Sequence, residues 1–279
     1  MPEGHTLHRL AGQLSELVGH EVTASSPQGR FDAGPVERSL VTDVQAYGKH
    51  LLVTLRPGPF PELVEGPSTS SGVGGGPELS VHVHLGMRGK WLRFSPVTGP
   101  GLKQVRLRLA TSEVAWDLIA PSTCELLDAD GPAALLATLG PDPLRAEADA
   151  DEARRRLQTY PGTVGAALMD QGVLAGVGNV FRAEILHACR IPPSRPAARV
   201  TDAEFAVLWP GLQAMMAQGV EDGRIITVDV PAGADRQAVP EAESRRVYKQ
   251  TACYDCGTTV VTTTVNGRTA YACPHCQPA

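Results

Sequence analysis

Two Cys-x-x-Cys pairs near the carboxyl end constrain the fold of this chain more than any other feature of its sequence. Sixteen residues separate the pairs, a length that allows a β-hairpin to bring four thiolates onto one tetrahedral ion. A closed four-sulfur site leaves no open coordination position, so we expect one structural Zn²⁺ whose loss unfolds the hairpin. The predicted ligands are Cys253, Cys256, Cys273 and Cys276.

The segment between the two pairs carries a strong turn signal. Asn266-Gly267 favours a two-residue hairpin turn, which places Arg268 near the tip. An arginine at such a tip is either a solvated turn charge or a ligand-binding residue, and the turn alone does not decide between them. Zinc hairpins occur in many unrelated proteins, so this module names no function by itself.

Length and composition indicate two domains and a small module in a chain of 279 residues. No apolar run approaches the roughly 20 residues of a membrane span, and the first residues lack a signal-peptide pattern, so we expect a cytoplasmic protein without membrane contact. Cys124 and Cys189 are expected to be buried thiols. The net charge of -5 argues against a nucleic-acid partner unless basic residues cluster. One stretch does cluster them: Arg88, Lys90, Arg93, Lys103, Arg106 and Arg108.

Hydrophobic periodicity divides the chain into a strand-rich and a helix-rich part. Leucines at helical spacing open the chain, and short alternating runs follow, which indicate an antiparallel sandwich or barrel. The expected strands are 50–55, 79–85, 90–94, 105–109 and 114–118. The expected helices are 146–159, 163–170, 179–189 and 202–218. Residues 57–77, rich in Gly, Ser and Pro, are expected to be a disordered surface loop without a catalytic role.

These patterns predict an α+β multidomain chain. We expect residues 1–128 to form an antiparallel β-sandwich with a flanking helix and to carry the catalytic terminus. Residues 129–242 are expected to form a helical domain with linkers, and residues 243–279 the four-cysteine zinc module.

The amino terminus carries the strongest candidate for covalent chemistry. Removal of Met1 would leave the secondary amine of Pro2 at the chain start. An α-amine titrates near roughly 8, against about 10.4 for lysine, so part of it is neutral and nucleophilic at physiological pH. Glu3 is placed to move protons if burial raises its pKa. A proline at position two can also mean only a trimmed start.

Six segments together resemble the formamidopyrimidine-DNA glycosylase and endonuclease VIII family, in the order in which that family has them. The resemblance covers nearly the whole chain apart from residues 57–77 and 224–244. The segments are Met1-Pro2-Glu3-Gly4, Tyr47-Gly48-Lys49-His50-Leu51-Leu52, His84-Leu85-Gly86-Met87, Leu139-Gly140-Pro141-Asp142-Pro143-Leu144, Asp170-Gln171 with Ala175-Gly176-Val177-Gly178-Asn179-Val180, and the cysteine hairpin with Arg268.

The resemblance implies a base-excision repair enzyme that acts as a monomer on damaged DNA. It implies that Pro2 is the Schiff-base nucleophile and Glu3 the proton donor. Lys49 and Arg268 are implied to contact phosphates and to assist elimination. The residues between 139 and 180 imply a helical domain of the helix-two-turns-helix type.

Three further residues are implied to contact DNA. Asn179 opens a helix whose amides are expected to point at phosphate. Met87 resembles the wedge that enters the stack when a nucleotide is flipped out, although methionine is elsewhere usually core filler. His84 is expected either to contact phosphate or to be a packing residue.

Two departures qualify the resemblance. The family usually has Pro-Glu after the first four residues, whereas His5-Thr6 stands here, which puts rate and substrate range in doubt. Residues 119–124 replace the formamidopyrimidine branch's Asp-Pro-Arg-Arg-Phe-Gly run. Together with Gly4, this favours the endonuclease VIII branch, whose preferred lesions are oxidised pyrimidines and abasic sites.

The sequence therefore predicts a bifunctional DNA glycosylase and abasic-site lyase, bacterial, cytoplasmic and nucleoid-associated when on DNA. Two alternatives stay open at this point. A DNA-damage-binding protein could keep the DNA contacts and lack turnover, which His5-Thr6 would allow. A zinc-ribbon accessory factor for transcription or replication would have no use for a free Pro2 amine.

Overall fold

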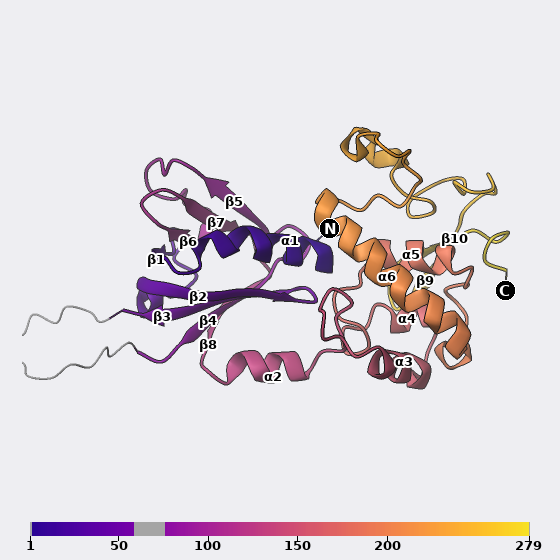
Figure 1. Cartoon of the computed structure of the whole chain (residues 1–279), viewed down its shortest axis with the longest axis horizontal. Helices are drawn as coiled ribbons and strands as arrows, with labels where there is room; N and C mark the ends of the chain where they lie inside the picture. Colours follow the sequence, from indigo (N-terminus) through magenta and orange to yellow (C-terminus); the bar gives the residue numbers. More distant parts are fainter. Residues whose placement is uncertain (1, 59–75, 279) are drawn as a thin grey trace, which may run out of the picture. The chain divides into compact units, whose positions relative to one another are not determined.

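The computed structural model describes residues 2–58 and 76–278 and divides into two compact units (Figure 1). The first unit comprises residues 1–2, 10–46 and 50–136, and the second comprises residues 3–9, 47–49 and 137–279. Most of the expected loop at 57–77 lies outside the described residues.

Helix α1 (Gly4–Leu14) and a 3-10 turn (Ser15–Leu17) open the chain. The leucines that predicted this helix are buried, as their spacing requires. They are Leu7, Leu10, Leu14 and Leu17.

The first unit is built on one eight-stranded sheet in the order β5-β7-β6-β1-β2-β3-β4-β8. Figure 1 shows β5, β6 and β7 as one layer and β2, β3, β4 and β8 as another, which gives the expected sandwich. The bounds are β1 (Glu21–Ser25), β2 (Arg38–Tyr47), β3 (His50–Pro57), β4 (Leu79–His84), β5 (Lys90–Phe94), β6 (Val105–Ala110), β7 (Ala115–Ile119) and β8 (Thr123–Leu127).

The five expected strands are confirmed as β3 to β7, whereas β1, β2 and β8 were not predicted. Strand β8 lies at the edge of the sheet and has no fully buried residue, so its sequence carries no alternation. Helix α2 (Gly131–Ala137), which follows it, also buries no residue and was missed for the same reason.

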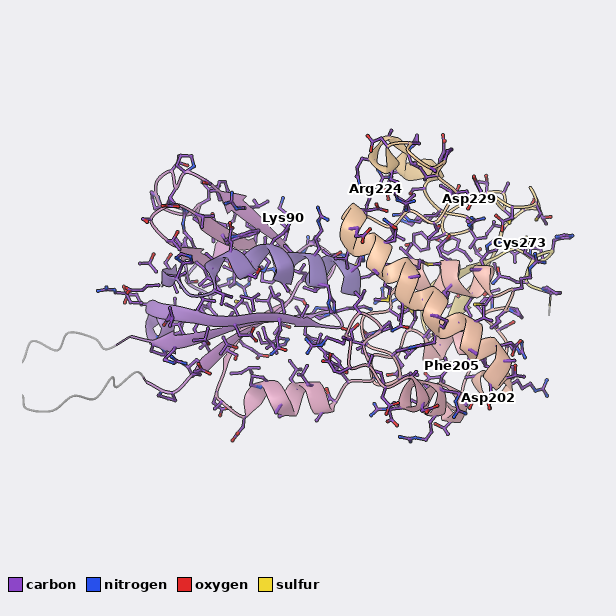
Figure 2. The ribbon with its side chains drawn as sticks, viewed as in Figure 1. Lys90, Asp202, Phe205, Arg224, Asp229 and Cys273 are labelled. Carbon is purple, nitrogen blue, oxygen red and sulfur yellow. The ribbon has the colours of Figure 1, made fainter. Side chains whose placement is uncertain are left out.

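The four helices expected in the second unit are confirmed, with bounds set by their caps. These are α3 (Ala150–Thr159), α4 (Val164–Ala167), α5 (Asn179–Ala188) and α6 (Asp202–Asp222). Thr201 and Glu204 form a capping box at the start of α6, where Figure 2 marks Asp202 and Phe205. The helix runs four residues beyond the expected end because Gly223 closes it at a φ of 69°.

The helices enclose an apolar core that includes Leu157, Phe181, Leu208 and Met216. The predicted terminal hairpin is present as β9 (Val261–Val265) and β10 (Arg268–Ala272), with Asn266 and Gly267 both at positive φ in the turn. Across the described ranges, no helix has the length and apolarity to cross a membrane.

Candidate active site and metal centre

The carboxylate of Glu3 caps helix α5. Its Oε1 accepts the backbone N–H of Val180 at 2.9 Å, and its Oε2 accepts that of Phe181 at 3.3 Å. Gly178, the residue before the helix, has no side chain to make these bonds, so Glu3 satisfies two otherwise unpaired donors. The expectation that these amides point at phosphate is therefore wrong for Val180 and Phe181.

Burial raises the pKa of the Glu3 carboxyl group. The side chain is 1% exposed, and this burial raises the pKa of its carboxyl group against the lowering effect of the two amides and of Lys49. Gly178 makes the burial possible, because a Cβ at that position would lie 2.2 Å from the Glu3 Cδ. Only glycine fits beneath the carboxylate.

Lys49 is held through the residue that precedes it. The N–H of Gly48 donates to Oδ2 of Asp142 at 2.6 Å, and Nε2 of His8 contacts the same oxygen at 2.7 Å. Gly48 adopts a φ of 57°, and a Cβ there would lie 2.9 Å from that of Ala175. The fully buried Asp142 thus fixes the turn that presents Lys49.

The loop before α5 is organised by Gln171. Its Oε1 accepts the N–H of Gly176 at 3.0 Å, and its Nε2 donates to the carbonyl of Val177 at 3.1 Å. The carbonyl of Gly176 in turn accepts the N–H of Gly4 at 2.8 Å. Four of the segments that carried the resemblance, those with Gly4, Gly48, Asp142 and Gly176, are therefore tied together by hydrogen bonds within the second unit.

Asn179 is fixed by the terminal hairpin and by a buried arginine. Its Nδ2 donates to the carbonyl of Thr269 at 3.0 Å, and Arg182 donates to its Oδ1. Arg182, 1% exposed, also donates to Thr269 at 2.8 Å and to the carbonyl of Gly165 at 3.3 Å. Sequence reasoning missed Arg182; its spacing of three from Asn179 on one helix was the available signal.

The electrostatics bring three predicted site residues together. Burial lowers the pKa of Lys49, Arg268 lowers it further, and the Glu3 carboxylate opposes both. Arg268 is exposed at the start of β10, next to the residue that Asn179 contacts. Glu3, Lys49, Asn179 and Arg268 thus all belong to the second unit.

The other predicted residues, Pro2, His84 and Met87, belong to the first unit. Pro2 is half-buried and directly precedes Glu3 in the chain. Met87 is 72% exposed in the turn after β4, as a wedge requires and a core filler does not. Nδ1 of His84 accepts the N–H of Gly86 at 3.1 Å, which places the hydrogen of the neutral ring on Nε2.

His5 is a buried neutral residue. It is 4% exposed, and its ring meets that of Phe181 edge-to-face at 5.2 Å. Burial, with Arg245 adding to it, lowers the pKa of His5 from 6.5 to about 4. At position 5, the departure from the family pattern therefore places an uncharged imidazole ring where burial would make a charged side chain destabilising.

The four predicted ligands meet at one point. Their Sγ atoms all lie within 4.8 Å of one another, with separations of 3.5 Å, 3.6 Å and 3.9 Å for three pairs. A tetrahedral metal with bonds of about 2.3 Å would set its sulfurs about 3.8 Å apart, whereas a disulfide requires about 2.05 Å. The cluster therefore fits a metal ion; Figure 2 marks one of its members, Cys273.

The two remaining cysteines depart from expectation. Cys124 and Cys189 are half-buried rather than fully buried. Partial burial raises the pKa of Cys124 to about 12 and that of Cys189 to about 11, so both are poor nucleophiles.

Comparison with known proteins identifies the family. Residues 1–118 match the formamidopyrimidine-DNA glycosylase N-terminal domain, and residues 139–230 match the formamidopyrimidine-DNA glycosylase H2TH domain. The chain belongs to the formamidopyrimidine-DNA glycosylase and endonuclease VIII family. As a member of this family it is a DNA glycosylase and abasic-site lyase, which confirms the resemblance predicted from the sequence.

Relatives within the family are found on both branches. Endonuclease 8 1 of Mycobacterium tuberculosis (strain ATCC 25618 / H37Rv) is 37% identical over 287 residues, covering 99% of this chain and 100% of the relative. The formamidopyrimidine-DNA glycosylase of Thermomicrobium roseum is 30% identical over 217 residues, covering 70% of this chain and 74% of the relative.

Solved structures share the family fold. The structure of MutM in complex with carbocyclic 8-oxo-G containing DNA aligns with a TM-score of 0.75 at 19% identity, covering 100% of both chains. Lactococcus lactis formamidopyrimidine-DNA glycosylase, non-covalently bound to DNA containing an AP site, aligns with a TM-score of 0.75 over 99% of this chain and 100% of that one.

Proposed function

We propose that this chain excises oxidised bases, preferentially pyrimidines, from damaged DNA through a Schiff base on Pro2 and then nicks the strand by β- or β,δ-elimination. The observation that carries the proposal is the buried Glu3 carboxyl, whose pKa is raised, directly after the nucleophile in the chain. Glu3, Lys49 and Arg268 influence one another electrostatically, which supports a shared role around one nucleotide.

The proposed chemistry assigns each proton and electron pair. With Met1 removed, the Pro2 nitrogen attacks the anomeric carbon of the deoxyribose, and the base leaves with the electron pair of the glycosidic bond and takes up the proton that the Pro2 nitrogen loses. Glu3 protonates the ring oxygen as the ring opens, which leaves an iminium between Pro2 and the sugar. A neighbouring sugar proton then passes to water, and the electron pair of its C–H bond moves towards the iminium. A C=C bond forms as the 3′ phosphate leaves with the electron pair of its C–O bond, and hydrolysis of the iminium frees the Pro2 amine.

The proposed DNA contacts come from both units. Lys49, Asn179 and Arg268 bind phosphates around the lesion, which positions the nucleotide without reading its sequence. In the first unit, His84 donates from Nε2 to a phosphate oxygen. Met87 fills the gap in the stack after the base is flipped out.

The lesion class is proposed from two observations. An endonuclease 8 of Mycobacterium tuberculosis is 37% identical over 99% of this chain, whereas the formamidopyrimidine-DNA glycosylase of Thermomicrobium roseum is 30% identical over 70% of it. Residues 119–124 also lack the formamidopyrimidine branch's run. The four cysteines are proposed to hold one structural Zn²⁺, because four thiolates in a closed tetrahedron suit that ion.

Borohydride trapping tests the mechanism. Mature protein incubated with abasic-site DNA and borohydride should give a covalent adduct, and Pro2→Gly, which replaces the secondary amine, should give markedly less. A gel shift without an adduct would show a damage-binding protein instead. Mass spectrometry of the mature chain must show that Met1 is removed, and a panel of oligonucleotides must show faster excision of oxidised pyrimidines than of oxidised purines.

A further inference from the structure

Helix α5 contacts the carboxyl-terminal module at three levels along its length. At its start, Asn179 donates to β10, as described above. In its middle, the fully buried carboxylate of Glu184 accepts the backbone N–H groups of three successive residues near the start of the module. These are Arg246 at 2.8 Å, Val247 at 3.1 Å and Tyr248 at 2.8 Å. Near its end, His187 reaches the cysteine cluster.

The contact between His187 and Cys253 is short and shielded from water. Nε2 of His187 lies 3.2 Å from Sγ of Cys253, and each residue is 2% exposed. A metal-bound thiolate has no hydrogen to donate, so the ring nitrogen must be the donor. Nδ1 of His187 has no hydrogen-bond partner among the described residues, which agrees with a neutral ring whose hydrogen is on Nε2.

A neighbouring carboxylate does not replace the sulfur as acceptor. Oδ2 of Asp255 lies 3.9 Å from the same nitrogen, beyond hydrogen-bond distance, and Arg246 donates to the other oxygen of Asp255. Cys253 is therefore the partner that fixes the His187 ring.

We propose that His187 is an outer-sphere residue of the metal centre, whose Nε2–H donates to the Cys253 thiolate and binds the ion's coordination shell to helix α5. The inference rests on the proposed zinc site. Four thiolates around one divalent ion carry a net charge of about minus two, which is costly away from water unless N–H groups approach the sulfurs. His187 supplies such a group from the helix that begins at Asn179.

The packing around the contact shields this hydrogen bond from water. A single apolar cluster joins Ala183 of α5 to the buried members of the module, so water does not reach this face of the metal centre. The cluster comprises Ala183, Val247, Cys253, Val260, Cys273 and Cys276. The module consequently uses α5 as part of its own core.

Two substitutions separate the hydrogen bond from the space that the ring fills. His187→Phe keeps an aromatic ring without a donor, and His187→Gln keeps an N–H near the position of Nε2. The control Ile185→Val removes a methylene from the same helix on the face that packs in the other core, which leaves the metal centre untouched.

Zinc affinity of the full-length protein is then measured by competition with a chromophoric chelator. Outer-shell partners of metal ligands are worth roughly 10–100-fold in metal affinity. His187→Phe should bind zinc at least about 10-fold more weakly, His187→Gln should recover most of the loss, and Ile185→Val should bind as the parent does. The thiolate-to-metal charge-transfer band of the Co²⁺-substituted protein should shift in His187→Phe alone.

Each failure has a distinct reading. If the parent protein contains no stoichiometric zinc, the proposed metal site is wrong. If the parent contains zinc and His187→Phe folds, binds it with unchanged affinity and shows an unshifted Co²⁺ spectrum, the inference about His187 is overturned while the metal site stands. If His187→Phe does not fold, the zinc affinity and the Co²⁺ spectrum of His187→Gln decide the question. Values equal to those of the parent support a donated hydrogen bond. A zinc affinity about 10-fold weaker than that of the parent overturns the inference about His187.

Discussion

Oε1 of Glu3 accepts the backbone N–H of Val180 at 2.9 Å across 177 positions of sequence. The residue after the proposed nucleophile is thereby fixed to the helix that begins with Asn179, a proposed phosphate-binding residue. The link has a strict steric condition, because the backbone at Gly178 must pass directly beneath the carboxylate. A substitution of Gly178 should therefore slow base excision by displacing the Glu3 carboxylate, and not by removing a side chain that binds DNA.

Gly178→Ala is predicted to displace the Glu3 carboxylate. The added methyl would lie 2.2 Å from Cδ of Glu3, so the side chain must leave the helix amides or the loop must shift. We expect base excision, measured as single-turnover cleavage of a lesion-bearing duplex, to fall by about 100-fold, the size of a typical general-acid contribution. Gly12→Ala is the matched control, because a Cβ there meets nothing within 4 Å on an exposed face of α1. Equal rates for both variants would contradict the proposed role of Glu3.

The pH dependence of excision should follow Glu3. Because burial raises the pKa of its carboxyl, the protonated donor is present below that pKa and is lost as pH rises through it. The single-turnover excision rate should therefore fall on the alkaline side, and Glu3→Gln should give a lower rate without that limb. An alkaline limb that survives unchanged in Glu3→Gln would assign it to another group.

His5 is predicted to make the fold acid-sensitive. Its pKa is 6.5 in the unfolded chain and about 4 in the folded one, so the unfolded state binds more protons between these values. The stability that His5 contributes is complete above pH 6.5 and is lost as pH falls towards 4, by about 3 kcal/mol in total. Between pH 7 and pH 4.5, the free energy of unfolding measured in urea should decrease less for His5→Gln than for the parent. For His20→Gln, a substitution at an exposed position, the free energy of unfolding should decrease as much as it does for the parent.

Most elements with strong periodicity could be predicted from the sequence, β1 and β2 excepted, and the elements that bury nothing could not. Helices α5 and α6 and strands β3 to β7 each carry an apolar face, so their positions are readable. Strand β8 and helix α2 have no fully buried side chain, and β8 also depends on pairing with the distant strand β4, which no local pattern records.

The same division holds for the site. Short motifs pointed to Glu3, Lys49, Asn179 and Arg268, whose roles stay predictions, but the motifs did not show which residues hold them in place. Neither the burial of Arg182 nor its bond to the Thr269 carbonyl can be read from sequence, because the partner lies 87 positions away. The positions of Pro2, His84 and Met87 around DNA stay predictions.

Asp142→Asn is predicted to loosen the turn that presents Lys49. The Oδ2 of the buried carboxylate accepts the N–H of Gly48 at 2.6 Å and contacts His8 at 2.7 Å, and its Oδ1 accepts the N–H of Leu144 at 2.9 Å. An amide in either orientation would therefore turn its NH2 group towards a backbone N–H. A loss of about 2–3 kcal/mol in the free energy of unfolding is expected from the unpaired buried groups. Asp128→Asn is the control, because the exposed Asp128 carboxylate accepts only one N–H of a turn; this variant should change the free energy of unfolding by less than about 0.5 kcal/mol. Similar losses in urea titrations of the two variants would show that Asp142 does not fix this turn.

Arg182→Met is predicted to weaken DNA binding without removing a phosphate contact. Arg182 is 1% exposed and donates to both Asn179 and Thr269, so its loss frees the proposed phosphate-binding amide and the strand that starts at Arg268. Affinity for a duplex with an abasic-site analogue should fall about 10-fold, but the dependence of affinity on salt should keep its slope. Lys49→Gln or Arg268→Gln, which remove a proposed phosphate contact, should instead reduce that slope by about one.

The control for this prediction is a second arginine that holds backbone in the same unit. Arg156 donates to the carbonyls of Leu139 and Gly172 and makes no contact with Asn179 or Thr269. Arg156→Met should lower the free energy of unfolding while it leaves the affinity within about 2-fold, since the groups at the start of α5 keep their positions. A salt slope reduced by one in Arg182→Met would mean that the buried guanidinium itself binds phosphate, and the positioning role would then be wrong.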